Sequence, residues 1–415
     1  MMLLGRYKTV ITPSLPCALA GFAHRTEEAT EKYGELYLRT TMLKSGDATL
    51  CFFAADLIWW DDELVNKLRK QISRRENIPE SHLHFTATHT HSGPQVSDRF
   101  SERLGRYDEA YVQQLIEKVC KSVKQCRANL EPVQIFVRKT NMDLGIYRRK
   151  LINGKVEMAP DPAVEVDDEV TVVSFINENN RELATWIHYA CHPTTTDANI
   201  VSGEFPGVCT AELESEDEGC VVSFFQGFSG DVRPKLISNN AFYRGSLDEM
   251  IAAGKALAQR IADVKKQPCS PEKKVQLCVA EALLPLEYTN IPNEPDIPLS
   301  LYEEWKQKKE QHDVEQLRFS YIRISENLAL LLANAEMTQG YGKFLKSRDR
   351  HLLPVGYSNG MVGYIATKEQ LEQGGYEAET FIYYFSLKGK LDPSMEEKIQ
   401  KVCLTLKEDC NVQAD

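Results

Sequence analysis

The chain of 415 residues has no uninterrupted apolar run that approaches the roughly 20 residues needed to cross a bilayer. Its start, Met1–Lys8, has no long apolar stretch followed by a small-residue cleavage site, so it does not resemble a secretory signal, although a signal removed beforehand would leave no trace. Positive charge is also scarce, because 49 Lys and Arg residues face 60 Asp and Glu residues and the net charge is −11. A broad basic face for nucleic acid is therefore excluded, and we expect the charge to serve solubility.

Cysteine motifs are missing as well. The 11 cysteines are scattered from Cys17 to Cys410, and none forms a CxxC pair. Such scattering is typical of free thiols in a reducing compartment and not of a disulfide scaffold, so we predict a cytoplasmic location. The chain also has no internal repeat and no low-complexity segment. Its 42% hydrophobic and 26% charged residues are an ordinary globular composition.

Apolar periodicity predicts strands that alternate with helices. The expected strands are Leu50–Ala55, His82–Thr88, Val170–Ile176, Leu183–Tyr189, Cys220–Phe225 and Leu353–Tyr357. The expected helices are Asp61–Arg75, Tyr111–Cys126, Met250–Ile261 and Pro393–Leu406. The third and fourth strands flank a polar turn and predict a hairpin. The fold class that follows is α/β, with a mixed β-sheet core and flanking helices.

Three stretches do not fit this alternation. Arg149–Asp167 has no clear period, and Pro285–Pro298 is broken by prolines, so both are predicted to be linkers or lids. Glu303–Glu315 is charge-rich and is predicted to be a solvated helix. The chain is long enough for a sizeable core.

Four of the nine histidines fall between His82 and His91. His89 and His91 lie two positions apart at the end of a predicted strand, and alternate strand side chains share a face. Both imidazoles would then reach one cavity, one as a metal ligand and the other as a proton-transfer group. The alternative is a hydrogen-bonded pair at a strand end. His82 and His84 have the opposite parity and are predicted to face elsewhere.

His192 stands at the end of another predicted strand and precedes Pro193, which favours an extended backbone. A ligand presented there suits a metal site, although a turn histidine fits equally well. His188 lies inside the apolar strand and is predicted to be packed. A zinc hydrolase needs three or four N, O or S ligands and a position for water, so further ligands must come from elsewhere.

Five segments resemble motifs of the neutral/alkaline non-lysosomal ceramidase family, in the same order. Thr88–Pro94 (THTHSGP) resembles the first signature, and Ser358–Glu377 resembles the last; these two are the specific ones. Gly145–Arg149, Cys191–Gly207 and Phe225–Val232 resemble the motifs between them. The resemblance spans roughly Thr9 to Ile382. It implies the fold of the family's catalytic domain and a zinc site.

Carried over residue by residue, the resemblance implies the following site. The expected zinc ligands are His89, His192, Glu336 and Tyr364. Glu336 lacks the proline that precedes the family's glutamate, and its alternative role is a carboxylate at a helix start. The residues expected to transfer a proton and stabilise an oxyanion are His91, Arg148 and Tyr376.

One position departs from the family's pattern. Arg233 follows Gly-Asp-Val where the family has an essential serine. A guanidinium there would bind a carboxylate, sulfate or phosphate, or would fill the space of a lipid amide. We expect Arg233 and Asp231 to be the substrate-binding residues. The chain is also shorter than the ceramidases, so residues 1–415 are expected to form a single domain with no C-terminal β-sandwich domain, and both points argue against ceramide.

The leading hypothesis is a zinc-dependent hydrolase of an amide (C–N) bond in a small polar or anionic substrate. The alternatives are an esterase or lactonase, a zinc-assisted lyase or isomerase acting on a polar sugar or acid, and a non-catalytic zinc-containing binding protein. A Cys191 nucleophile is disfavoured, because a metal-ligating His192 cannot also serve as its base. The expected partner is a small molecule, and a homo-oligomer remains open.

Overall fold

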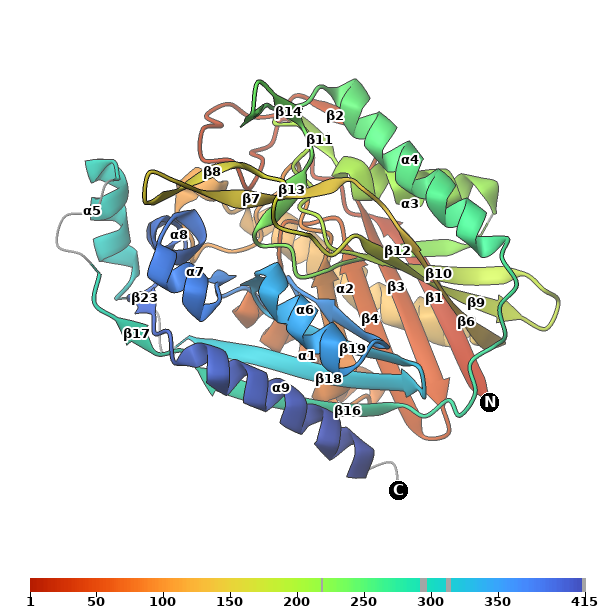
Figure 1. Cartoon of the computed structure of the whole chain (residues 1–415). Helices are drawn as coiled ribbons and strands as arrows, with labels where there is room; N and C mark the ends of the chain where they lie inside the picture. The colour runs from red at the N-terminus through yellow and green to blue at the C-terminus, as the bar shows by residue number, and fades with distance from the viewer. Residues whose placement is uncertain (218, 292–296, 311–314, 413–415) are drawn as a thin grey trace.

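Two β-sheets packed face to face occupy the centre of the molecule (Figure 1). The computed structural model describes residues 1–217, 219–291, 297–310 and 315–412. The larger sheet has eight strands, in the spatial order β12 (Val221–Gln226), β10 (Glu182–Tyr189), β9 (Glu169–Asn177), β6 (Glu131–Asn141), β1 (Met2–Val10), β3 (Tyr37–Ser45), β4 (Ala48–Ala55) and β5 (Leu83–Ala87). The pairs β10–β12 and β4–β5 are parallel and the others antiparallel, so the sheet is mixed.

The smaller sheet covers one face of the larger one. Its spatial order is β16 (Cys278–Pro285), β18 (Gln316–Ser325), β19 (Leu328–Ala333) and β21 (Leu352–Val355). Between the sheets, Phe52 and Trp186 of the larger sheet share an apolar cluster with Leu330 of the smaller one. Their near-complete burial removes a large apolar area from water and joins the two sheets firmly.

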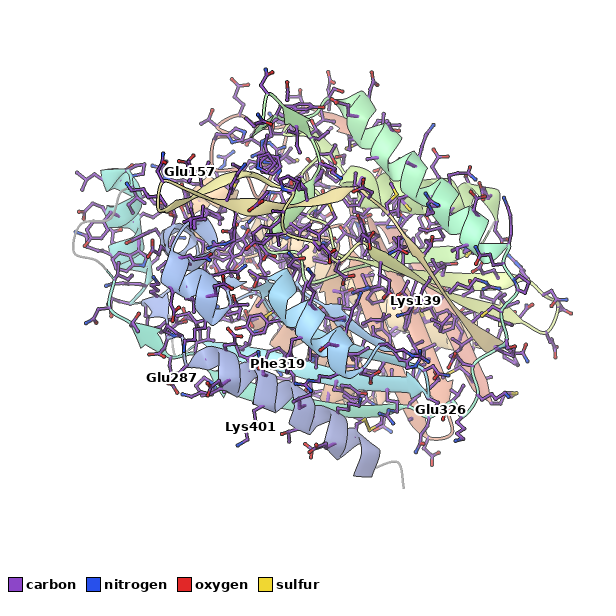
Figure 2. All side chains as sticks on the ribbon, viewed as in Figure 1. Lys139, Glu157, Glu287, Phe319, Glu326 and Lys401 are labelled. Carbon is purple, nitrogen blue, oxygen red and sulfur yellow. A yellow bond between two sulfur atoms is a disulfide. The ribbon has the colours of Figure 1, made fainter. Side chains whose placement is uncertain are left out.

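Helices cover the outer faces of both sheets. The larger sheet packs against α1 (Asp62–Glu76), α2 (Glu109–Ala128), α3 (Glu204–Glu216) and α4 (Leu247–Lys265). The smaller sheet packs against α6 (Gln339–Arg348) and α9 (Met395–Val412). Figure 2 shows the two sides of this last layer: Lys401 of α9 is exposed, whereas Phe319 of β18 is fully buried. The predicted α/β class, with a mixed sheet and flanking helices, is confirmed.

Short elements connect these layers. They are β2 (Glu31–Tyr33), β7 (Gly145–Ile152), β8 (Lys155–Asp161), β11 (Ile200–Ser202), β13 (Val232–Pro234), β14 (Ile237–Ser238), β15 (Ala241–Phe242), β17 (Tyr288–Thr289), β20 (Glu336–Met337), β22 (Tyr364–Ile365), β23 (Lys390–Leu391), α5 (Leu299–Lys308), α7 (Lys368–Gln373) and α8 (Phe381–Tyr384). Two 3-10 turns span Glu80–His82 and Glu102–Leu104, and a π-helical turn spans Tyr376–Thr380. No helix of the described residues is long and apolar enough to cross a membrane.

The prediction of a linker at Arg149–Asp167 is wrong. This stretch contains most of the β7–β8 hairpin, on which Glu157 is labelled in Figure 2. The turn is Asn153-Gly154, and both residues have positive φ, 52° and 80°. An Asn-Gly pair of this kind is a strong hairpin signal, because it tolerates the left-handed backbone that a tight turn requires.

Two other boundaries also differ from the predictions. The Pro285–Pro298 stretch contains β17, and its residues 292–296 lie outside the described residues. The charge-rich helix begins earlier than predicted: α5 starts at Leu299 and ends at Lys308, and residues 311–314 also lie outside the described part.

The prediction that all cysteines are free thiols is wrong. Cys278 of β16 and Cys410 of α9 form a disulfide, while the other nine cysteines are free thiols. The two partners are 132 residues apart in sequence. Their pairing depends on α9 packing against the smaller sheet, which cysteine spacing cannot reveal. The cysteine pattern therefore gives no support to a cytoplasmic location.

Candidate functional site

Three buried imidazoles meet beyond the ends of β5 and β10. The Nε2 atom of His89 lies 3.0 Å from Nε2 of His192 and 3.2 Å from Nε2 of His91. The prediction that His89 and His91 share a strand face is wrong, because β5 ends at Ala87. His89 instead adopts a left-handed backbone with φ of 64°, which is uncommon for a residue with a side chain and recurs at functional sites.

Backbone carbonyls fix the tautomers of two of these rings. Nδ1 of His89 lies 2.8 Å from the carbonyl oxygen of Ile58, and Nδ1 of His192 lies 2.9 Å from that of Ser229. A carbonyl oxygen only accepts, so each Nδ1 carries the hydrogen and each Nε2 presents a lone pair. Orientation of a ligating histidine by a bond to its other nitrogen is a common feature of metal sites.

Glu336 completes this arrangement. Its Oε2 lies 3.3 Å from Nε2 of His89 and 3.4 Å from Nε2 of His192, and it has no hydrogen-bond partner among the described residues. The side chain is only 2% exposed. Two imidazole lone pairs and a carboxylate oxygen therefore face one another without a proton donor between them. This donor set fits a divalent cation such as zinc, which takes nitrogen and oxygen ligands.

The protonation states agree with such a site. Burial, and then the positive charge of Arg148, lower the pKa of His192 to about 4, so this ring is neutral at pH 7. Burial and the neighbouring His89 and His192 lower the pKa of His91 well below its usual value. Burial disfavours ionisation of Glu336, whereas a protonated ring at His89 or His192 would favour it and lower its pKa. Neutral imidazoles and an ionised carboxylate are the forms that bind metals.

His91 is closer to the other histidines than the sequence indicated. His89, His91 and His192 form a group whose ligand atoms all lie within 4.8 Å of one another. His91 is therefore placed either to ligate or to exchange protons with whatever the other two hold. His91 also lines a pocket together with His192, whereas His89 is not among the lining residues.

Tyr364 reaches the site through strand pairing. The short strands β20 and β22 run parallel, with Glu336 opposite Tyr364 in the register. Burial and the carboxylate of Glu336 raise the pKa of Tyr364, while Arg148 lowers it. Tyr376 packs edge-on against Tyr364, with ring centroids 5.5 Å apart. Both tyrosines line the same pocket as His91 and His192.

Arg148 is held in place by a carboxylate that the sequence did not single out. Its Nη2 donates to Oη of Tyr364 at 3.1 Å, and its Nε donates to Oε1 of Glu377 at 2.7 Å. The other oxygen of Glu377 accepts from Nη1 of Arg149 at 2.6 Å. All three charged side chains are buried. The pair of charge-assisted bonds to Glu377 fixes the orientation of the Arg148 guanidinium.

Tyr357 is another residue that sequence reasoning missed. Its ring stacks on His89, with centroids 3.9 Å apart and planes 25° from parallel. Its hydroxyl lies 3.4 Å from Oγ of Ser229, whose carbonyl oxygen accepts from His192. The positive φ of Tyr357, 51°, is not visible in the sequence. Tyr357 therefore holds the rings of the site in position.

The pocket in front of the histidines has a volume of about 410 Å³. Its lining residues are Gly21, Phe22, Ala23, His24, His91, Arg103, Leu104, Arg148, Met158, His192, Thr194, Arg233, Arg244, Tyr364, Tyr376 and Tyr384. Arg233 of β13 is 4% exposed and lies over the ring of Phe242, with Cζ 4.3 Å from the centroid. The structure thus brings Arg233 into the pocket that His91 and His192 border.

Asp231 is not brought into this pocket. One of its carboxylate oxygens accepts from the backbone N–H of Gln339 at 2.7 Å, and the other from Nε2 of Gln370 at 2.7 Å. The residue is fully buried and borders a separate cavity. Its carboxylate lies at the start of α6, where it satisfies the free N–H group of Gln339 and interacts favourably with the helix dipole. Asp231 therefore does not line the pocket that Arg233 borders, and substrate binding by Asp231 stays a prediction that its position does not support.

The remaining candidate histidines lie outside the site, and the Cys191 thiol is not reactive. His84 packs against Phe52, with ring centroids 5.1 Å apart, and His82 contacts the carbonyl oxygen of Thr49. His188 is packed, with Nε2 2.8 Å from the carbonyl oxygen of Pro354. Burial and Glu204 raise the pKa of the Cys191 thiol, so it is not a thiolate at neutral pH.

Comparisons with known proteins show a family for this chain. A sequence model of the N-terminal part of the neutral/alkaline non-lysosomal ceramidases matches residues 3–254. The neutral ceramidase of Pseudomonas aeruginosa is 25% identical over 170 residues, which are 38% of this chain and 25% of that protein. Neutral ceramidase 1 of Arabidopsis thaliana is 21% identical over 250 residues, which are 57% of this chain and 32% of that protein. The matches thus span a quarter to a third of the relatives' length.

Solved structures extend the likeness over nearly the whole chain. The crystal structure of the neutral ceramidase from Pseudomonas aeruginosa superposes with a TM-score of 0.78 and 16% identity, over 98% of this chain and 74% of that one. A ceramidase complexed with C2 gives a TM-score of 0.76 and 16% identity, over 96% of this chain and 74% of that one. At such low identity the likeness is one of fold.

Proposed function

This chain belongs to the neutral/alkaline non-lysosomal ceramidase family, and we propose that it is a metal-dependent hydrolase of an amide bond in a small polar or anionic substrate. One observation carries the proposal. The Nε2 atoms of His89 and His192 and the Oε2 atom of Glu336 lie within 3.4 Å of one another, buried and without a proton donor between them. Burying three electron-pair donors at one point is unfavourable unless a cation joins them.

His89, His192, Glu336 and Tyr364 are the proposed ligands, and zinc is the proposed metal. When bound, zinc supplies a Lewis acid that polarises a carbonyl group and lowers the pKa of water towards neutrality. Tyr364 is buried, and its hydroxyl accepts a hydrogen bond from Nη2 of Arg148; burial and Glu336 raise its pKa, so it is proposed as a ligand that loses its proton when the metal binds. Ile58 and Ser229 hold the two imidazoles through their carbonyl oxygens.

The other residues of the pocket act on the substrate. Arg148 and Tyr376 are the proposed donors that stabilise the negative oxygen developing on the attacked carbonyl group. Because Glu377 fixes the guanidinium of Arg148, little reorientation is needed as that charge appears. His91 belongs to the histidine cluster and lines the pocket, so it is the proposed group that takes a proton from the attacking water and passes it to the leaving amine.

An amide is favoured over an ester or lactone by the relatives. They are named neutral ceramidases, and ceramide is a lipid amide. The substrate itself is proposed to differ, because Arg233 occupies the pocket where a neutral lipid amide would have to lie. That same replacement favours one alternative, a zinc-containing binding protein that no longer turns over its ligand.

Metal content tests the proposal directly. We expect about one zinc per chain after loading and desalting, measured by inductively coupled plasma mass spectrometry. His89→Ala and His192→Ala should lose this metal, whereas His82→Gln, a histidine from the same segment but outside the site, should retain it. Folded wild-type protein that takes up no zinc would overturn the proposal.

Product analysis then separates hydrolysis from the alternatives. A panel of small amides, esters and lactones is incubated with zinc-loaded protein in heavy-oxygen water. Incorporation of solvent oxygen into an acid product identifies hydrolysis, whereas a lyase or isomerase gives a product without it. Retained zinc without turnover of any member would favour the binding protein.

A further inference from the structure

The pocket in front of the candidate metal site is lined by several arginines. Four arginines line it, Arg103, Arg148, Arg233 and Arg244, together with three histidines. Among the described residues that line it, none is Asp or Glu. The chain as a whole carries a net charge of −11, so this local positive charge runs against the composition. A cavity walled by one sign of charge concentrates ligands of the other sign.

Arg233 lines this pocket, and one edge of its guanidinium has no partner among the described residues. Its Nε and Nη2 atoms are buried and have no hydrogen-bond partner among the described residues. These two nitrogens form one side of the guanidinium, where two parallel N–H bonds match two oxygens of a carboxylate, sulfate or phosphate. Phe242 supports the face of the group, so the free edge is held in place. A buried guanidinium without partners is unfavourable unless a ligand supplies them.

Arg244 is the second available cation. Its Cζ lies 4.5 Å from the ring centroid of Phe22, and its Nε is 3.9 Å from Oδ2 of Asp197, too far for a hydrogen bond. Burial, then Arg244 and Arg148, lower the pKa of Arg233 to about 9, so Arg233 stays charged at neutral pH and repels Arg244. An anion between them would remove this repulsion.

The nearby Arg25 is not available in the same way. Its Cζ lies 4.7 Å from the centroid of the Phe22 ring, which Arg244 also contacts. Unlike Arg244, its guanidinium donates to backbone carbonyl oxygens. The acceptors are the carbonyl oxygens of His91, Asp197 and Ala198. Arg25 therefore ties loops together and leaves Arg233 and Arg244 as the pair that faces the cavity.

We propose that Arg233 and Arg244 form a subsite for an oxyanion group of the substrate, a carboxylate, sulfate or phosphate. The substrate is then a small acidic amide. Its amide bond rests on the proposed function, whereas its anionic group rests on the two arginines alone. The cavity volume of about 410 Å³ lies near the lower end of the roughly 300 to 1,000 Å³ of small-molecule sites, which agrees with a compact ligand.

Anion binding tests the subsite without a known substrate. Sodium sulfate, phosphate and acetate are titrated by calorimetry at constant ionic strength kept with chloride, using the zinc-loaded full chain. We expect Arg233→Gln to weaken the preferred anion about tenfold or more, and Arg244→Gln to weaken it less, because only Arg233 is fully buried. Arg106→Gln, an exposed arginine outside the pocket, removes the same charge and should bind as the wild type does.

The preferred anion among the three identifies the acid. Binding of sulfate and phosphate over acetate indicates a sulfate or phosphate ester group, and the reverse order indicates a carboxylate. Arg233→Lys retains the charge but loses the two-nitrogen edge, so it should bind more weakly than wild type even though it keeps the fold. Equal binding by wild type and Arg233→Gln, or no binding by the wild type, would overturn the subsite.

A metal-free background separates this proposal from the proposed function. Anions also bind metals directly, so the titration is repeated with His89→Ala, which lacks a proposed ligand. Retained anion binding by His89→Ala supports the subsite. Loss of anion binding together with the metal overturns it. A wild-type chain without zinc that still binds the anion through Arg233 would end the hydrolase proposal and leave the subsite standing.

Discussion

Two arginines on neighbouring strands line one pocket and differ in their hydrogen-bond partners. Arg148 on β7 and Arg233 on β13 are 5% and 4% exposed, and their strands pair with each other. Arg148 donates to Glu377 and Tyr364, whereas the Nε and Nη2 atoms of Arg233 have no partner among the described residues. The difference separates a group that is already positioned from one that is available to a ligand.

The energetic consequence is also opposite for the two residues. Burying a guanidinium removes its hydration, and a hydrogen-bonded carboxylate offsets that loss only when its geometry is good. Arg148 has such a partner and Arg233 does not. Natural sequences break the rule of satisfied buried charge mainly at functional sites, where stability is sacrificed for binding. Substitution of each residue in turn measures how much its partners contribute.

The largest effect is expected from Glu377→Gln. It leaves Arg148 and Arg149 buried without the carboxylate that they share, and breaking a buried pair on one side lowers the free energy of unfolding by about 3 to 5 kcal/mol. Urea denaturation followed by circular dichroism measures it. A change below about 1 kcal/mol would mean that Arg148 is no better satisfied than Arg233.

Arg148→Gln should have a smaller effect on stability, because Glu377 keeps its bond to Arg149. We expect a loss of about 1 to 3 kcal/mol in the free energy of unfolding. Turnover of an amide substrate should fall by about a hundredfold or more in kcat, as for other lost oxyanion donors. Unchanged kcat with a raised KM would reassign Arg148 to substrate binding.

Arg233→Met should stabilise the protein, in contrast to the two preceding variants. It replaces an unpartnered buried charge with an apolar side chain that still packs on Phe242, so the free energy of unfolding should rise by about 1 to 2 kcal/mol. Thermal and urea unfolding without added oxyanion measure the change. A destabilised variant would show that the guanidinium already has partners in the ligand-free protein, and the contrast with Arg148 would disappear.

The smallest effect is expected from Arg106→Gln. This arginine pairs with Glu28, and its side chain is 61% exposed. An exposed ion pair contributes little, so the free energy of unfolding should change by less than about 0.5 kcal/mol. Unfolding in urea beside the other variants measures it, and a larger shift would show that loss of one positive charge alone perturbs the molecule.

Much of the fold was predictable because its signals are local. Alternating apolar residues and helical spacing located β4, β9, β10, α1 and α2 within a few residues of their ends. The β7–β8 hairpin was also readable from its Asn-Gly turn, and overlooking that pair led to the wrong linker assignment. The extent of α9 was underestimated, since it continues to Val412.

The site was predictable only in part. The histidine motif drew attention to His89, His91 and His192, and the structure brings all three together. Whether they bind a metal remains a prediction. Nothing local indicates that Tyr357 stacks on His89 or that Glu377 holds Arg148, because each of these contacts joins distant segments.

Local sequence was enough to locate most strands and helices and to find the clustered histidines, because both signals depend on neighbours a few positions away. The packing of distant segments places His89 and His192, 103 residues apart, at 3.0 Å. It also places Arg233 at the pocket that His192 lines, with Nε and Nη2 lacking partners among the described residues, while Asp231 borders another cavity. Those outcomes depend on how two sheets pack and where their strands end. Side-chain periodicity within a strand carries no information about which other strand it will face.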